Sequence, residues 1–156
     1  PRPIFKKINI TEIINRAIDF TKMSSKNEIN FQNKKTKIFI NGDAEQLNRV
    51  FINLIKNSEE AFIELISKSP DFKGIIDIEI DSNNDYIVVK LSDNGTGISD
   101  TKKVMTPYFT TKTKGTGLGL PIVSKIINEH SGDFTIKNKK NNKGVVIEIL
   151  FPKLDA

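Results

Sequence analysis

Apolar residues return at a helical period in three stretches of this chain. The spacing predicts a short amphipathic helix over residues 11–22, a long one over residues 43–67 and a third over residues 121–130. Each helix carries its apolar residues along one side, and that side must be covered by another layer of structure. We therefore expect the helices to pack on a sheet.

The predicted helix ends carry residues that are typical of caps. Thr11 is a suitable N-cap for the first helix, and Asp43 with Gln46 three residues later matches a capping box for the second. Pro121 fits a first helical turn, and Gly132 is the expected stop of the third helix.

Between the helices, apolar and polar residues alternate as they do in strands. The pattern predicts three hairpins, over residues 28–41, 74–92 and 134–151, and the first of these turns at residues 33–35. Residues 1–10 are predicted to be an extended lead-in. Strand pairs separated by helices favour a largely antiparallel or mixed sheet with helices on one face, which is an α+β fold of two layers.

Composition and charge exclude several classes of protein. The 156 residues include no cysteine, so disulfides, thiolate zinc sites and cysteine nucleophiles are excluded. Apolar runs are only a few residues long, and no membrane span is predicted. The net charge of +5 comes from lysine groups without interleaved exposed aromatic residues, which favours a solvated surface over a nucleic-acid interface.

Two glycine clusters stand between the predicted sheet and the third helix. Residues 93–98 (Asp-Asn-Gly-Thr-Gly-Ile) directly follow a strand, and residues 115–120 (Gly-Thr-Gly-Leu-Gly-Leu) lead into a helix, whose first N–H groups favour an anion. The Asp93 carboxylate can accept a hydrogen bond from an exocyclic amine, although Asp-Asn-Gly is also ordinary turn chemistry. Neither cluster has the spacing and context of a phosphate loop or a dinucleotide fingerprint.

The predicted long helix carries two asparagines that complement these clusters. Asn53 and Asn57 are one helical turn apart and share a shoulder of the apolar face, with Glu60 slightly further round. Taken singly, each is typical of a helix surface. Amide oxygens are nevertheless suitable ligands for Mg²⁺.

Four motifs in a fixed order make the chain resemble sensor histidine kinases. Residues 53–58, 93–97, 107–112 and 115–120 are similar to the N, G1, F and G2 boxes of these kinases, which belong to the GHKL superfamily with gyrase B, MutL and heat-shock chaperones. The short distance between the last two motifs most resembles the nitrogen-regulation NtrY/NtrB type. The resemblance covers nearly the whole chain. It implies the Bergerat ATP-binding fold, an α/β sandwich with a mixed, mostly antiparallel sheet of about five strands against three helices.

The resemblance also implies a site for ATP and Mg²⁺. Asp93 is expected to bind the adenine amino group, with Gly95 and Gly97 letting the backbone approach the base. Asn57 is expected to ligate Mg²⁺, and Asn53 to lie near the γ-phosphate as the catalytic residue. The remaining residues expected to contact the nucleotide are Ile98, Thr111, Lys112, Gly115, Thr116, Gly117, Leu118 and Gly119.

Three positions depart from the patterns of the kinases and their relatives. Asn53 stands where gyrase-type ATPases have a glutamate that activates water, which favours phosphoryl transfer over hydrolysis. Glu60 stands where many histidine kinases have a basic residue, and residues 144–146 (Gly-Val-Val) stand where a threonine is common. Glu60 and the altered last strand leave open a non-catalytic nucleotide-binding scaffold, whereas Asn53 disfavours the other alternative, a GHKL-type ATPase.

The resemblance implies partners outside this chain. Residues 1–10 are expected to be a linker from a dimerisation and phosphoacceptor domain, and residues 11–156 to be the catalytic ATP-binding domain. His130, the sole histidine, sits at a helix end and is expected to have a structural or capping role. The accepting histidine is therefore expected on upstream helices of the same protein.

The remaining expectations concern the setting of the domain. A response regulator is the expected partner of the full-length kinase, whereas this domain is expected to contact neither nucleic acid nor membrane. We expect the domain to be cytoplasmic, and an inner-membrane location of the full-length sensor stays open.

Overall fold

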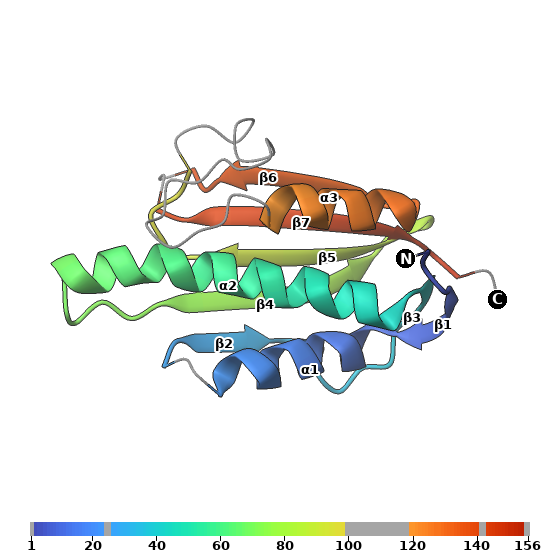
Figure 1. Cartoon of the computed structure of the whole chain (residues 1–156), viewed down its shortest axis with the longest axis horizontal. Helices are drawn as coiled ribbons and strands as arrows, with labels where there is room; N and C mark the ends of the chain where they lie inside the picture. The colour runs from blue at the N-terminus through green and yellow to red at the C-terminus, as the bar shows by residue number, and fades with distance from the viewer. Residues whose placement is uncertain (1, 24–25, 99–118, 141–142, 155–156) are drawn as a thin grey trace.

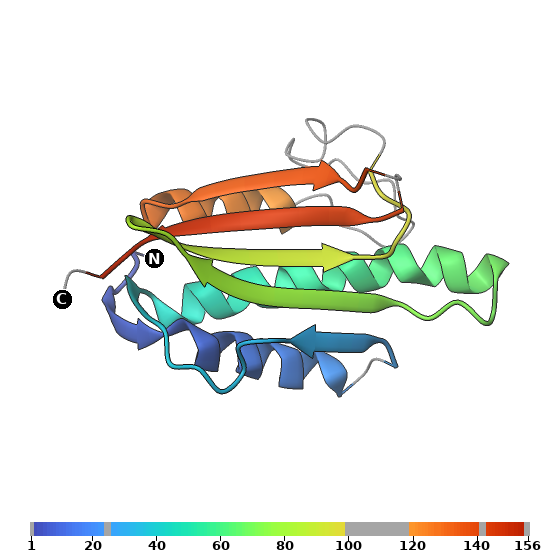
Figure 2. The same ribbon diagram turned by 180° about the vertical axis from the view of Figure 1, so that it is seen from behind.

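The computed structural model describes residues 2–23, 26–98, 119–140 and 143–154. These residues form two layers, with helices on one face of a sheet (Figure 1) and the other face of the sheet open (Figure 2). The helices are α1 (Ile10–Lys22), α2 (Ala44–Lys68) and α3 (Gly119–Glu129). The strands are β1 (Lys6–Asn9), β2 (Glu28–Phe31), β3 (Phe39–Gly42), β4 (Ile75–Ser82), β5 (Tyr86–Asp93), β6 (Asp133–Asn138) and β7 (Val145–Pro152).

The main sheet has five strands in the order β2-β4-β5-β7-β6. β2 runs parallel to β4, and the other neighbouring pairs are antiparallel. This confirms the predicted α+β sandwich, with a mixed and mostly antiparallel sheet of five strands. The hairpins β4–β5 and β6–β7 are also confirmed.

The prediction of a hairpin over residues 28–41 is wrong, because β2 and β3 do not pair with each other. A turn does form, where Thr36 N–H donates to the Asn33 carbonyl at 2.9 Å, but the two strands then separate. β2 joins the edge of the main sheet beside β4, where the Asn33 side chain accepts from Ile80 N–H at 2.7 Å. β3 instead pairs with β1 in a separate antiparallel sheet of two strands.

α2 is the central helix and packs between α1 and α3 (Figure 1). The buried side chains of α2 cover more of the helix surface than the single apolar face that the sequence predicts. The reason is that α2 contacts α1 and α3 on its two sides as well as the sheet. Ile55, which lies outside the predicted apolar face, is fully buried, whereas Ala61 and Leu65 are only half-buried. The buried side chains of α2 are Leu47, Val50, Phe51, Leu54, Ile55, Ser58 and Phe62.

The helix starts differ in detail from the predicted caps. Asn9, not Thr11, caps α1, since its Oδ1 accepts from Thr11 N–H at 3.1 Å. Asp43 caps α2 as predicted, with Oδ1 accepting from Gln46 N–H at 3.1 Å. The capping box is not closed, however, because Gln46 Oε1 is buried without a hydrogen-bond partner.

His130 takes the place that the Gln46 side chain leaves. Its Nε2 accepts from Asp43 N–H at 3.0 Å, and its Nδ1 lies 2.8 Å from the Ile126 carbonyl of α3. The ring is therefore neutral, with the proton on Nδ1, and it joins the end of α3 to the start of α2. This confirms the predicted structural and capping role, and it adds a partner on α2 that the sequence did not indicate.

The end of α3 forms a Schellman motif in which Ser131, not Gly132, adopts the left-handed conformation. Ser131 has φ 56° and donates to the Asn128 carbonyl, while Gly132 N–H donates to the Ile127 carbonyl at 2.9 Å. Gly132 is needed for another reason: a Cβ at this position would lie 2.4 Å from the Leu150 carbonyl oxygen.

Candidate active site

Asp93 is the last residue of the central strand β5, and its carboxylate is held inside the protein. Only 5% of the residue is exposed. Oδ1 accepts from the backbone N–H groups of Gly95 at 2.9 Å and Val145 at 3.2 Å. Oδ2 accepts from the Ser58 hydroxyl of α2 at 2.7 Å. Three donors from three elements therefore fix an acceptor group at the end of the sheet, as buried polar groups require.

The backbone around Asp93 is packed so closely that side chains are excluded. A Cβ on Gly95 would lie 3.1 Å from Ala61 Cβ and 3.2 Å from Asp93 Oδ1. Gly97 has φ 81°, a conformation that favours glycine. Gly144 combines both constraints, with φ 124° and only 1.9 Å between an added Cβ and the Asp93 carbonyl oxygen.

Two asparagines that the sequence reasoning missed hold the loop after β5. Asn94 Oδ1 accepts from Ile75 N–H at 2.8 Å, and its Nδ2 donates to the Lys73 carbonyl at 3.0 Å. Asn138 of β6 accepts from Ile98 N–H at 2.7 Å and donates back to the Ile98 carbonyl. Each side chain bonds a backbone segment at two points, and nothing in a single sequence indicates which distant segment an asparagine will hold.

Asn57 on α2 lies against the start of α3. A Cβ on Gly119 would be 3.5 Å from Asn57 Nδ2 and 3.6 Å from Oδ1, so the helix start approaches this amide in ordinary contact. Asn57 and Asn53, one turn earlier, are both half-buried on α2. The structure thus brings Asp93, Gly95, Asn57 and Gly119 around α2 from three different elements.

Six of the predicted nucleotide-contacting residues lie outside the described residues. They are Thr111, Lys112, Gly115, Thr116, Gly117 and Leu118. Their roles stay predictions.

The donor set fits a purine nucleotide with a divalent cation. The anchored Asp93 oxygens suit a ligand amine. Asn57 offers a neutral amide oxygen, a ligand type that Mg²⁺ accepts alongside water and phosphate oxygens. Within residues 2–23, 26–98, 119–140 and 143–154, no group of three acidic or histidine side chains could hold a metal ion.

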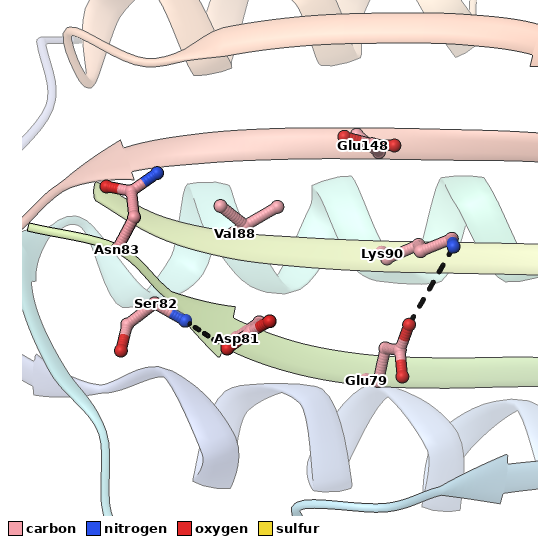
Figure 3. A pocket seen from close by; sticks show the side chains of 7 residues that line it. All are labelled: Glu79, Asp81, Ser82, Asn83, Val88, Lys90 and Glu148. Atoms are coloured by element: carbon pink, nitrogen blue, oxygen red, sulfur yellow. Dashed lines mark hydrogen bonds and ion pairs between the residues drawn. The ribbon is translucent and has the colours of Figure 1, made fainter. Parts of the chain in front are cut away.

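A hollow that none of these residues lines lies on the open face of the sheet (Figure 3). It is lined by Glu79, Asp81, Ser82, Asn83, Val88, Lys90 and Glu148. Its single ion pair, between Lys90 Nζ and Glu79 Oε1 at 3.9 Å, is half-exposed and contributes little to stability. Charged residues alternate here with the buried side chains that face the helices, so the hollow is a solvated sheet surface.

Comparison with known proteins places the chain among ATPases. Residues 42–155 match the family described as histidine kinase-, DNA gyrase B-, and HSP90-like ATPase. A putative sensor histidine kinase NtrY-like of Rickettsia prowazekii is 33% identical over 97% of this chain and 24% of its own length. Sporulation kinase A of Bacillus subtilis is 40% identical over 77% of this chain and 19% of its own length. The chain thus spans about a quarter or less of these relatives.

Solved structures of histidine kinases share the fold of this chain. The catalytic domain of histidine kinase ThkA in a nucleotide-free form superimposes with a TM-score of 0.74, at 30% identity, covering 96% of each chain. The mycobacterial sensor histidine kinase MprB has a TM-score of 0.79 at 21% identity, covering 98% of this chain and 100% of that one. In the described part of the present chain, no helix is both long and apolar enough to cross a membrane.

Proposed function

The chain belongs to the histidine kinase-, DNA gyrase B- and HSP90-like ATPase family, and on that premise we propose that it binds ATP with Mg²⁺ and donates the γ-phosphoryl group to a histidine outside this chain. It is an ATP-binding catalytic domain of the sensor histidine kinase type. The phosphoryl transfer, the metal and the accepting partner are the proposed parts.

One observation carries the proposal: Asp93 is buried, yet Oδ2 accepts from only one of the donors described above, Ser58. A carboxylate oxygen can accept two hydrogen bonds, so Oδ2 has the capacity for a ligand donor beside Ser58 among the residues that the structure describes. An exocyclic amine, as on adenine, is a suitable donor. The glycines at positions 95 and 144 let α2 and the backbone of β7 lie close to Asp93.

The phosphate end of the ligand is assigned to α2 and α3. Asn57 beside Gly119 is proposed to ligate Mg²⁺, and Asn53 to lie near the γ-phosphate. The first N–H groups of α3 favour negative charge at that end. When bound, Mg²⁺ neutralises phosphate charge, while the protein supplies mainly positioning, as in other phosphoryl transfers. Asn53 cannot act as a general base toward water, which favours transfer over hydrolysis.

Isothermal titration with ATP and Mg²⁺ tests the binding step. The wild type should bind, Asp93→Ala should lose binding, and Asn57→Ala should lose the Mg²⁺ dependence. No binding by the wild type, or full binding by Asp93→Ala, contradicts the proposal.

The transfer step needs a longer protein, because the chain covers about a quarter of its kinase relatives. We propose that upstream helices carry the accepting histidine, that a response regulator receives the phosphoryl group next, and that the domain works in the cytoplasm. Labelled phosphate on the upstream histidine would support transfer. Steady phosphate release by the isolated domain would instead favour an ATPase, and binding without transfer a scaffold.

A further inference from the structure

We propose that Ser58 is a positioning residue for base recognition, which holds the Asp93 carboxylate in the orientation that accepts a hydrogen bond from a 6-amino purine. The inference rests on the proposed function, since it concerns the same site. It adds to that function a residue that discriminates between nucleotides.

Ser58 makes an unusual contact for a serine in the middle of a helix. Such side chains commonly bond a carbonyl one turn earlier or point to solvent. Ser58 is 3% exposed, and its hydroxyl leaves α2 to donate to Asp93 Oδ2 on β5 at 2.7 Å. A short hydrogen bond to an ionised oxygen is among the stronger kinds.

The two oxygens of Asp93 are held in different ways. Oδ1 accepts from two backbone N–H groups, those of Gly95 and Val145, which use both of its acceptor positions. The last side-chain torsion of an aspartate is soft, and Oδ1 and Oδ2 turn together about it, so the Ser58 bond on Oδ2 narrows the same torsion that the two bonds on Oδ1 restrain. The Ser58 hydroxyl occupies one of the two acceptor positions on Oδ2.

No other side chain takes this role among the residues that the structure describes. Val145 lies across from Asp93, one residue beyond the Ser92–Val146 pair of β5 and β7, so both side chains face the helix layer. Val145 is buried and apolar, and it offers Asp93 only its backbone N–H. The hydroxyl that donates to Asp93 therefore comes from Ser58 of α2, since Val145 of β7 has none.

A fixed Oδ2 distinguishes purines by the group at position 6. Adenine presents an amine there, which donates to the carboxylate, whereas hypoxanthine presents a carbonyl oxygen, which is repelled by it. Removing the Ser58 hydroxyl should therefore weaken ATP binding by about tenfold, the effect of one hydrogen bond to a charged group. Binding of inosine triphosphate, which makes no such contact, should change little.

The test is isothermal titration of Mg·ATP and Mg·inosine triphosphate with the wild type, Ser58→Ala and Ser67→Ala. Ser67 is the matched control, because it is an exposed serine of the same helix that bonds only the Glu64 carbonyl. Of the two single variants, we expect only Ser58→Ala to show a smaller ratio of ATP affinity to inosine triphosphate affinity than the wild type. Val145→Thr added to Ser58→Ala places a hydroxyl on the strand side of Asp93, and recovery of the preference supports the inference.

Two results overturn the inference. One is an unchanged ATP preference in Ser58→Ala. The other is an equal loss of both nucleotides, which would show a structural role. Thermal unfolding without nucleotide, together with Ser58→Cys as a variant of similar shape, separates loss of folding from loss of recognition. If the wild type itself fails to bind ATP, the proposed function fails; if it binds and Ser58→Ala matches it, only this inference fails.

Discussion

At the scale of single residues, the site depends on positions where the backbone leaves no room for a side chain. Gly144 is the clearest, since its φ of 124° and the 1.9 Å approach to the Asp93 carbonyl oxygen exclude any other residue without movement. Gly119 differs, because an added Cβ there meets its nearest neighbour at 3.5 Å. Close packing and backbone conformation thus require glycine at position 144 but not at position 119.

We predict that Gly144→Ala destabilises the domain and weakens ATP binding. The backbone conformation alone costs on the order of 1–3 kcal/mol, and the contact with Asp93 adds to it. Urea unfolding measures the loss. Gly119→Ala is the control and should leave stability within roughly 1 kcal/mol of the wild type; equal stability of Gly144→Ala and wild type would contradict the prediction.

Asp43 gives a residue-scale prediction on pH. Partial burial raises the pKa of Asp43. The hydrogen bonds that its carboxylate accepts from the N–H groups of Ile4, Gln46 and Glu45 together lower the pKa by more, so the net pKa lies below the ordinary value. A carboxyl with a lowered folded pKa stabilises the protein above its unfolded pKa, and this stabilisation is lost as the pH falls through the folded pKa.

Asp43→Ala should therefore cost roughly 0.5–2 kcal/mol at pH 7, as for other N-caps. The difference from the wild type should shrink once the pH falls below about 4, the ordinary pKa of an aspartate. Urea unfolding between pH 7 and about pH 2 covers the range in which the stabilisation is lost, with the exposed Asp19→Ala as control. A difference that stays constant over this range would show that the cap does not depend on charge.

At the scale of elements, the chain's own pattern predicted helices and hairpins well where contacts are local. The β4–β5 and β6–β7 hairpins join strands that follow each other directly, and alternation defines both. β2 and β3 also alternate and also follow each other, yet their partners are β4 and β1. Alternation identifies a strand but not the strand with which it pairs.

The junction of α2 and α3 was likewise beyond sequence reasoning. Asp43 and Gln46 match the sequence pattern of a capping box. The Asp43 N–H nevertheless donates its hydrogen bond to Nε2 of His130, 87 residues away. Phe5 covers the same imidazole edge-on, with ring centroids 4.9 Å apart. A local motif was thus replaced by a contact between distant elements.

We predict that His130→Phe destabilises the domain without removing the proposed phosphoryl transfer. The ring would be kept, but Asp43 N–H would lose its acceptor in a buried setting, which costs about 1–3 kcal/mol. Urea unfolding measures the loss. In a longer protein with the upstream helices, phosphate incorporation should persist; its complete loss with unchanged stability would instead identify His130 as the acceptor.

At the scale of the whole molecule, ordered motifs indicated candidate site residues but not the residues that support them. Asp93, Asn57 and Gly119 are expected at one site because those motifs resemble one family. In the structure Ser58 of α2 bonds Asp93 and Gly119 lies against Asn57, while their contacts with a nucleotide stay predictions. Ser58, Asn94 and Asn138, which hold those residues or the loop beside them, carry no motif of their own. Their roles come from the fold, since each bonds a segment that is distant in sequence.

Because these elements all come from one chain, the domain should bind nucleotide without its upstream partner, and Mg·ATP should stabilise it. Binding to the folded state alone adds about 2.7 kcal/mol to the free energy of unfolding at a ligand concentration of 100 times Kd. Thermal unfolding with increasing Mg·ATP measures this, and the rise should be absent in Asp93→Ala, whose site lacks the acceptor. A wild type that unfolds at the same temperature with and without Mg·ATP would mean that residues outside this chain are needed to complete the site.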